Sequence, residues 1–375
     1  MAFEELRGYL SELTEMKVIP AISIAIGKGT TMMYRDSFGE ISESGRKVTE
    51  TTRFDIASMT KILSGIGFMK LVEQGRFELD GKICEYFPEL QTVKPIERNG
   101  QIIGMCDCSK ITWYHVLTHT TGMGWTRTKT RPSLPHLDKG LKDIFSLPLA
   151  YNIGEHIVYS DIPVILMGKA MEACTDKPLD QLIEELVCKP LKLENTGYIR
   201  LSKKSEIRGG REDIVPTEFD EIFRRERVWG YVHDENAYLL DGVAAHAGIF
   251  STARDMCYLG MAYNACLEHD GVVLEETAKQ MTQEMEEEDG DRRGLIWQLS
   301  SSGENAYTRF LSEQAYGHSG FTGCFMWIDP VTGIVVTFLS NDAYNGRDNR
   351  RLFECREDIM RLAVEETALW MENCL

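Results

Sequence analysis

The sequence predicts an α+β fold in which an antiparallel sheet is built from both ends of the chain and a long helical segment is inserted between them. Segments rich in β-branched and aromatic residues lie near the start, at 21–38, and near the end, at 320–340. The stretches between them show mainly helical periodicity. A chain of 375 residues, 43% of them hydrophobic, has room for a large core and more than one lobe.

The first elements follow from local patterns. An amphipathic segment at 3–16 predicts a helix, and the apolar run 21–27 predicts a buried strand with its hairpin partner at 31–38. The apolar residues of 57–75 fit a mostly buried helix that Gly75 ends.

The remaining elements are helices, a loop region and late strands. Helices are predicted at 162–172, 179–187, 253–268 and 350–372, an extended loop region with short elements at 100–139, and strands at 320–328 and 333–340. We therefore expect residues 1–56 and 312–375 to form an α/β domain and residues 57–311 a mainly helical domain. The cleft between the two is the expected active site.

Charge and composition exclude several classes of function. The net charge of −17 makes nucleic acid an improbable partner, because phosphate backbones repel an acidic chain. The start of the chain has no basic residues followed by an apolar stretch, and no apolar run approaches about 18 residues. We therefore expect no membrane association, a cytoplasmic location and free thiols for the ten cysteines.

The acidic run between Glu284 and Asp291 predicts a solvated helix end and loop. The alternative, a calcium site, is weak because the order of ligands and the central glycine of an EF-hand are absent. Neither a metal nor another cofactor is expected.

Ser58 and Lys61 lie three residues apart at the start of a predicted helix. Residues at this spacing share a helix face, so the lysine amine is expected to reach the serine hydroxyl. Such an amine takes the serine proton only when it is neutral, which burial and nearby positive charge favour. This spacing alone is common in ordinary helices, so other motifs must support the pair.

Further motifs along the chain support a functional role for Ser58 and Lys61. In order along the chain, the motifs are FDIASMTK at 54–61, LTHTTGM at 117–123, YSD at 159–161, GVAAHAGIFSTA at 242–253 and GHSGFTG at 317–323. Together they resemble the serine β-lactamase and penicillin-binding-protein superfamily, and within it the branch of class C β-lactamases, family VIII carboxylesterases, D-amino-acid peptidases and related acyltransferases. The resemblance runs from about residue 15 to the C-terminus and implies a β-lactamase/transpeptidase-like fold.

The resemblance also implies roles for individual residues. Ser58 is the expected nucleophile, Lys61 and Tyr159 the groups that move its proton, and the backbone N–H groups of Ser58 and Phe321 the oxyanion hole. Which of Lys61 and Tyr159 takes the first proton stays open. The substrate-binding residues that we expect are His318, Ser319 and Gly320, which line an edge strand, together with Asp161, His233 and Asp234.

Two positions depart from the common pattern of the branch. Asp161 stands where Asn is frequent, and an ionised carboxylate only accepts hydrogen bonds. This carboxylate weakens the case for β-lactam substrates. Two other roles are open to Asp161: an ion pair with Lys61, or the N-cap of the following helix. His318 stands in place of Lys, so a fixed positive charge for a substrate carboxylate is lost, unless the histidine is charged.

Other polar and aromatic residues carry weaker predictions. His119 is expected to be a structural histidine. His233, Asp234 and His246 have the residue types of a metal site, but a cleft-lining loop is the favoured interpretation. Trp125 and Trp229 are candidates for lining an apolar acyl pocket.

The sequence thus predicts a cytoplasmic serine hydrolase that acts on an ester or amide, including D-amino-acid-containing small molecules, through a Ser58 acyl-enzyme. The alternatives are an acyltransferase that passes the acyl group to an alcohol or amine, a weak β-lactamase or D-Ala carboxypeptidase, and a non-catalytic binding protein. The oligomeric state is not predicted.

Overall fold

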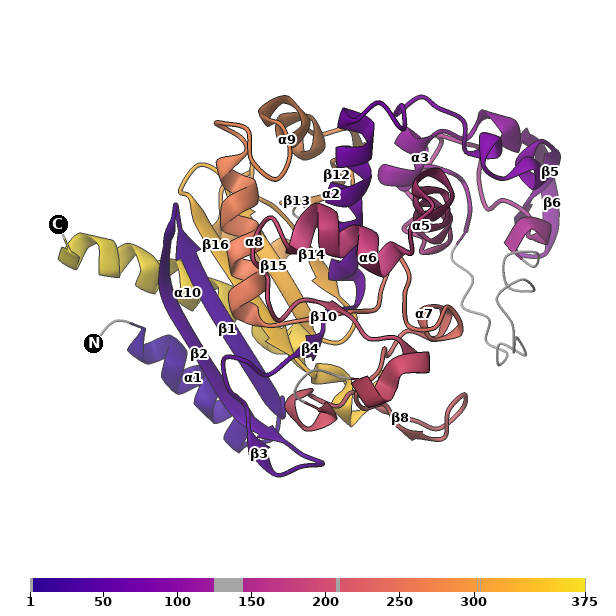
Figure 1. Cartoon of the computed structure of the whole chain (residues 1–375). Coiled ribbons are helices and arrows are strands. Elements are labelled where there is room, and N and C mark those ends of the chain that lie inside the picture. Colours follow the sequence, from indigo (N-terminus) through magenta and orange to yellow (C-terminus); the bar gives the residue numbers. More distant parts are fainter. Residues whose placement is uncertain (1–2, 125–143, 207–209, 302, 304, 375) are drawn as a thin grey trace.

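The computed structural model describes residues 3–124, 144–206, 210–301, 303 and 305–374, and a large antiparallel sheet organises this part of the chain (Figure 1). Its nine strands follow the order β11-β12-β13-β14-β15-β16-β1-β2-β3. The early strand β1 (Ala21–Lys28) pairs with β2 (Thr31–Ile41) on one side and with the late strand β16 (Ile334–Ser340) on the other. The prediction of a sheet built from both ends of the chain is confirmed.

The strand predicted at 320–328 is wrong in its extent. The structure has two strands there, β14 (Tyr316–Gly320) and β15 (Cys324–Asp329), joined by a tight turn in which the N–H of Gly323 donates to the carbonyl of Gly320. Gly323 has a φ of 107°, which a residue with a side chain rarely adopts. The two glycines therefore make a hairpin out of what the apolar pattern presented as one strand.

The loop predicted for the acidic run is also wrong. This segment forms the hairpin of β11 (Glu286–Glu288) and β12 (Asp291–Arg293), which β13 (Gln298–Leu299) joins to β14. In its register Glu286 lies opposite Arg293 and Glu287 opposite Arg292. Opposite charges across the two strands favour this pairing, and periodicity alone does not show it.

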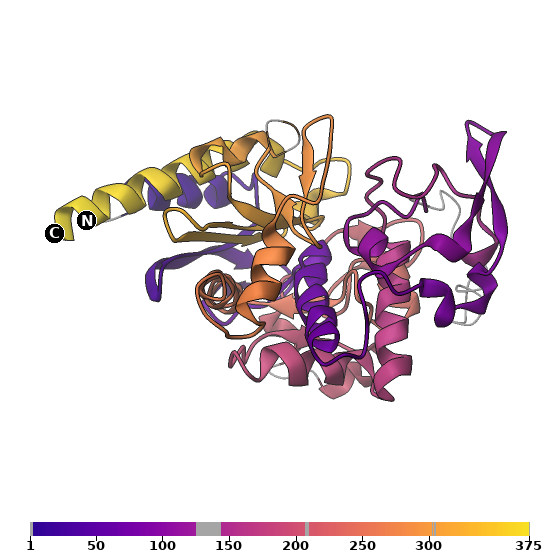
Figure 2. The same cartoon turned by 90° about the horizontal axis from the view of Figure 1, so that it is seen from above.

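Helices cover both faces of the sheet. The terminal helices α1 (Glu4–Glu15) and α10 (Leu352–Cys374) lie together on one face, while α8 (Ala253–Ala265) packs against β1, β15 and β16 on the other (Figure 2). Both faces are therefore apolar. The alternate residues Ile22, Ile24 and Ile26 of β1 contribute to the cluster beneath the terminal helices.

The rest of the chain forms helices and small sheets beside this layer. The helices are α2 (Thr60–Glu73), α3 (Trp113–Leu117), α5 (Ile162–Thr175), α6 (Leu179–Ile183), α7 (Glu235–Leu239) and α9 (Glu275–Thr282). The small sheets contain β4 (Phe54–Asp55), β5 (Val93–Arg98), β6 (Gln101–Asp107), β7 (Gly197–Tyr198), β8 (Phe219–Asp220), β9 (Glu226–Arg227) and β10 (Ile249–Ser251), whereas β3 (Arg46–Lys47) pairs with β2 at the edge of the large sheet.

The division at residues 57 and 311 stays a prediction. Strands β11, β12 and β13 belong to the large sheet and α8 packs against it, although all four lie between those two residues. Among the residues that the structure describes, no helix combines the length and the apolar character that crossing a membrane requires.

Candidate active site

Ser58 lies in a short 3-10 helix, η1 (Ala57–Met59), that leads directly into α2. Its Oγ accepts a hydrogen bond of 3.0 Å from Nζ of Lys61 in the first turn of α2. The preceding residue, Ala57, has a φ of 46°, and its N–H donates to the carboxylate of Asp55 at 2.8 Å. Non-glycine residues seldom adopt this conformation, and such strain clusters at active sites. The structure thus brings together the two residues that the spacing predicted to meet.

Lys61 is the centre of the group. Its fully buried ammonium donates to Ser58 Oγ, to the hydroxyl of Tyr159 at 2.7 Å and to Oδ1 of Asp161 at 2.7 Å. The carbonyl of His246 is a fourth, longer neighbour at 3.4 Å. A lysine ammonium has three N–H bonds, and the three shorter contacts match them.

The expectation of a neutral lysine differs from what these contacts favour. Complete burial acts to lower the pKa of Lys61, but the charge of Asp161 and the contact with Tyr159 outweigh it, and the pKa is raised. Asp161 stands at the N-cap of α5 but makes no capping hydrogen bond with its side chain, which pairs with Lys61 instead. Lys61 is therefore charged in the free protein.

Tyr159 is held by the segment that precedes α5. His119, which is buried and has a φ of 60°, packs its ring 4.7 Å from the Tyr159 ring. Its carbonyl accepts from the N–H of Val158 at 2.8 Å, and its Nδ1 accepts from the N–H of Ser160 at 3.4 Å. Burial, and next the charge of Arg293, lower the pKa of His119 well below its ordinary value. A neutral His119 therefore packs against the Tyr159 ring and accepts hydrogen bonds from the residues on either side of Tyr159.

The strand β14 borders the other side of the site. Its pairing with β13 involves Tyr316 and Gly317, and beyond them His318, Ser319 and Gly320 line the cavity. A Cβ added at Gly320 would lie 2.5 Å from the carbonyl oxygen of Ile56. The glycine therefore permits β14 to approach the turn that carries Ser58.

His318 does not supply the charge of the lysine that it replaces. Its Nδ1 donates to the carbonyl of Ser319 at 2.6 Å, and the ring is buried. Burial, and next the charge of Lys61, lower the pKa of His318 to about 3. A neutral imidazole at this position has no electrostatic preference for a carboxylate.

Arg293 is the cation at this end of the site, and the sequence did not single it out. Its side chain is 4% exposed, pairs with Asp291 at 2.8 Å and lies with its guanidinium carbon 5.5 Å from the centre of the Tyr159 ring. Its Nη1 has no hydrogen-bond partner among the described residues. The only signal in the sequence is the change from acidic to basic residues at Arg292 and Arg293.

His233 and Asp234 face different neighbours. His233 is buried and contacts Glu218, whereas Asp234 accepts from Nε2 of His246 at 2.7 Å and from the N–H of Ala237 at 2.8 Å. The potential metal-ligating atoms of Asp161, Asp234 and His246 lie within 4.8 Å of one another. The cluster thus includes Asp161 in place of the expected His233, and the ammonium of Lys61 beside Asp161 opposes a second cation there.

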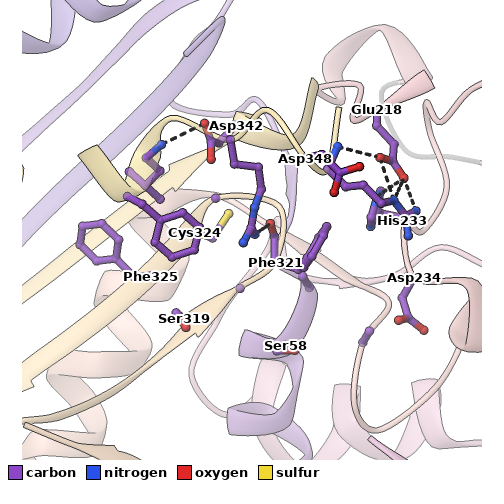
Figure 3. A pocket seen from close by; sticks show the side chains of 18 of the residues that line it. Ser58, Glu218, His233, Asp234, Ser319, Phe321, Cys324, Phe325, Asp342 and Asp348 are labelled. Atoms are coloured by element: carbon purple, nitrogen blue, oxygen red, sulfur yellow. Dashed lines mark hydrogen bonds and ion pairs between the residues drawn. The ribbon is translucent and has the colours of Figure 1, made fainter. Parts of the chain in front are cut away.

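Several of these side chains line one cavity of about 930 Å³. Figure 3 shows the part of the cavity around Ser58, His233 and Phe321. The cavity extends from Tyr159, Arg293 and His318 past Ser58 to Phe321 and the start of α10. The volume is ample for a small peptide or an ester with a second reactant. Of the two tryptophans proposed for an acyl pocket, Trp229 donates a hydrogen bond of 2.8 Å from its Nε1 to the carbonyl of Ile214. Trp125 lies outside the described residues.

The sequence matches known proteins over most of its length. A family model described as Beta-lactamase matches residues 6–358. The chain is 30% identical over 354 residues to a protein of Escherichia coli (strain K12) named "Putative D-alanyl-D-alanine carboxypeptidase", with 87% of this chain and 79% of that one covered. It is 32% identical over 337 residues to the "N-acetylmuramyl-L-alanine amidase" of Bacillus subtilis (strain 168), with 84% and 74% covered.

A solved structure shows the same fold. "EstCE1, a hydrolase with promiscuous acyltransferase activity" superposes with a TM-score of 0.73 at 19% identity. The match covers 96% of this chain and 98% of that one. At this identity the likeness speaks for the fold alone.

Proposed function

Because the chain belongs to the beta-lactamase family of serine enzymes, we propose that it hydrolyses ester or amide bonds of small molecules through an acyl-enzyme on Ser58. The observation that carries the proposal is the buried ammonium of Lys61, which contacts Ser58, Tyr159 and Asp161 at 3.0, 2.7 and 2.7 Å. An arrangement of nucleophile, proton acceptor and orienting charge is the requirement for activating a serine. A purely binding role does not require it.

Acylation begins with attack of Ser58 Oγ on the carbonyl carbon of the substrate. A charged Lys61 has no lone pair to receive the serine proton, so we assign this step to the oxygen of Tyr159, which accepts a hydrogen bond from Lys61 at 2.7 Å and must have lost its own proton to act as the base. The bond to the leaving group then breaks, and the hydroxyl of Tyr159 returns the proton to the departing oxygen or nitrogen.

The negative charge that develops on the carbonyl oxygen is placed between the N–H groups of Ser58 and Phe321. The N–H of Ser58 belongs to the first turn of a helix, where amides have no partner within the helix. Water then attacks the ester carbon, passes its proton to Tyr159, and Ser58 leaves with that proton. No cofactor takes part in these steps.

The charge of Arg293 supports a finer proposal about the substrate. Because His318 is neutral, Arg293 is the group at this end of the cavity that attracts a substrate carboxylate. We place the carboxylate of an acylated D-amino acid or D-dipeptide there, consistent with the printed name of the Escherichia coli relative. The absence of lysine at position 318 made substrates with a carboxylate improbable. With Arg293 as the cation, the proposal includes such substrates.

The activity is tested with p-nitrophenyl acetate, N-acetyl-D-alanyl-D-alanine, its L,L isomer and a chromogenic cephalosporin. We expect turnover of the ester and the D,D peptide, an added acetyl mass on Ser58, and neither result with Ser58→Ala. A Ser58→Ala protein that matches the wild type would overturn the proposal. Turnover of the cephalosporin alone would agree with Ser58 as the nucleophile but would contradict the proposed ester and D,D-peptide substrates.

The role of Arg293 is tested against its neighbour on the same strand. Arg293→Gln should raise KM for N-acetyl-D-alanyl-D-alanine about 10- to 100-fold relative to its C-terminal amide, since a charge-assisted contact contributes about 1.5–3 kcal/mol. Arg292, whose Nη1 donates to the carbonyl of Ser300 at 2.7 Å, provides the control Arg292→Gln. Equal effects of both variants, or equal effects on acid and amide, would exclude carboxylate recognition by Arg293.

Acyl transfer is the second candidate, because the cavity of about 930 Å³ has room for an acceptor beside the acyl group. The printed description of EstCE1 names the same combination of activities. Adding an alcohol or amine to the ester assay separates the two functions: a transfer product that forms faster than acetate would favour the transferase.

We propose that either reaction takes place in the cytoplasm, consistent with the free thiols of the nine cysteines between residues 84 and 355.

A further inference from the structure

The side chain of Phe321, the second residue of the proposed oxyanion hole, is enclosed on two sides. The ring of His233 is stacked against it with centroids 5.4 Å apart and an angle of 17° between the planes. The guanidinium carbon of Arg350 lies 4.3 Å from the ring centre, and Arg350 also donates to the carbonyl of Phe321 at 2.6 Å. Ring and backbone of Phe321 are therefore both fixed, which sets the direction of its N–H.

His233 is itself fixed by a buried carboxylate. Its Nε2 lies 2.9 Å from Oε1 of Glu218, whose side chain is 4% exposed (Figure 3). Although burial acts to raise the pKa of Glu218, the contacts with His233 and Arg347 lower it to about 2. The ionised carboxylate only accepts hydrogen bonds, so Nε2 of His233 carries the proton that it donates.

Arg347 holds this carboxylate from the other side. Its Nε donates to Glu218 at 3.0 Å, its backbone N–H donates to Oε2 at 3.1 Å, and its Nη2 also pairs with Glu235 at 2.6 Å. The imidazole of His233 is thus linked to a rigid pair of charges rather than to solvent. Its position is determined by the protein and does not need the substrate.

Asp55 joins this group to the nucleophile. One carboxylate oxygen accepts from the N–H of His233 at 2.7 Å, and the other accepts from the N–H of Ala57, next to Ser58. Its carbonyl accepts from the hydroxyl of Thr322, next to Phe321, at 2.6 Å. One buried residue therefore contacts the chain neighbours of both proposed oxyanion donors.

From these contacts we propose that His233, held by Glu218, is a positioning residue that keeps the N–H of Phe321 at its place in the oxyanion hole. The proposal rests on the proposed function and changes the expected role of His233 from binding the substrate to orienting a catalytic amide. It predicts an effect on the rate of acylation and little effect on KM, because His233 acts through Phe321 and not on the substrate.

The test compares His233→Ala with wild type on p-nitrophenyl acetate and on its thiono analogue, in which sulfur replaces the carbonyl oxygen. Sulfur is a poor acceptor, so a functioning oxyanion hole gives a large rate ratio of oxygen over sulfur substrate. We expect His233→Ala to lower kcat for the oxygen ester about 10- to 100-fold and to reduce this ratio by a similar factor. Loss of one oxyanion donor costs about 100- to 1,000-fold, and misplacement should cost less.

The control is His115→Ala, which removes a half-buried histidine. The ring of His115 is bound to Thr112 at 2.8 Å, away from the residues that line the cavity. This variant should lose stability but keep the oxygen-to-sulfur ratio. Rates are divided by the concentration of active sites titrated with a serine-reactive phosphonate, so partial unfolding does not imitate the expected result.

Glu218→Gln carries the test if His233→Ala does not fold, since it keeps the shape of the side chain. It should lower the ratio in the same direction. An unchanged ratio in whichever variant folds would overturn the positioning role while acetylation of Ser58 keeps the proposed function intact. Absence of acetylation in the wild-type protein would instead refute the proposed function itself.

Discussion

At the scale of single residues, the chemistry of the site depends on the charge of Lys61. Burial alone acts to make this lysine neutral and a base, but Asp161 and Tyr159 raise its pKa. Whether the lysine is base or cation therefore depends on a carboxylate that lies 100 residues further along the chain. Asp161, which stands where Asn is frequent, therefore favours the charged form of Lys61.

Asp161→Asn should lower the pKa of Lys61, because the largest remaining influence is burial, which disfavours the ammonium. If charged Lys61 is required, the alkaline limb of the pH profile of kcat/KM should move to lower pH. The measurement is the hydrolysis of p-nitrophenyl acetate between pH 5 and 11, the highest values corrected for spontaneous hydrolysis.

Asp180→Asn is a matched control, because Asp180 pairs with Arg200 at 2.6 Å outside the cavity. Its pH profile should equal that of the wild type. A shift of the acidic limb to lower pH in Asp161→Asn, with the alkaline limb unchanged, would identify Lys61 as the base and contradict the route through Tyr159.

At the scale of elements, the site is formed where β14 approaches the turn before α2. The turn between β14 and β15 carries Phe321, and η1 carries Ser58, so the two proposed oxyanion donors come from segments more than 250 residues apart. The missing side chain of Gly320 permits the contact with Ile56. The distance between these two elements determines whether both amides reach one oxygen atom.

Gly320→Ala should therefore reduce kcat about 100-fold or more, since its Cβ would displace β14 from the turn that leads to Ser58. Folding stability should fall by about 1–3 kcal/mol, the usual cost of inserting a methyl group into a packed region. Steady-state kinetics and urea unfolding measure the two effects.

Gly8→Ala is the control, because a Cβ at this exposed position in α1 meets nothing within 4 Å. It should raise stability by about 1 kcal/mol through helix propensity and leave kcat unchanged. Wild-type kcat in Gly320→Ala would mean that the spacing of β14 and η1 is not critical.

At the scale of the whole molecule, the site lies away from the N-terminal helix and the first hairpin, although the start of α10 borders it. The buried cluster beneath α1 and α10 includes Leu6, Leu10 and Leu13, whereas the residues that line the cavity include none from α1, β1 or β2 among the described residues. The N-terminal helix and the first hairpin thus complete the fold without lining the cavity. Stability and activity should be separable there.

Leu10→Ala tests this separation. Removing a fully buried leucine should cost about 2–5 kcal/mol, while kcat/KM per titrated active site stays at the wild-type value. Leu274→Ala, at a position that is 46% exposed, should change stability by less than about 0.5 kcal/mol. A large loss of activity in folded Leu10→Ala would show that α1 influences the cleft through the sheet.

The sequence by itself determined the sheet built from both ends of the chain, the meeting of Ser58 with Lys61 and the family that the ordered motifs indicate. These features follow from periodicity and short spacing, which are local properties of a chain. Local patterns did not reveal the β14–β15 hairpin within 316–329 or the strands in the acidic run, since pairing partners decide both.

Only the tertiary structure decided the charge of Lys61, the neutrality of His318, the presence of Arg293 beside Tyr159 and the contact of His233 with Phe321. The physical reason is common to all four. A pKa and a long-range contact depend on burial and on charges that folding brings together, and neither quantity is written in the spacing of residues along the chain.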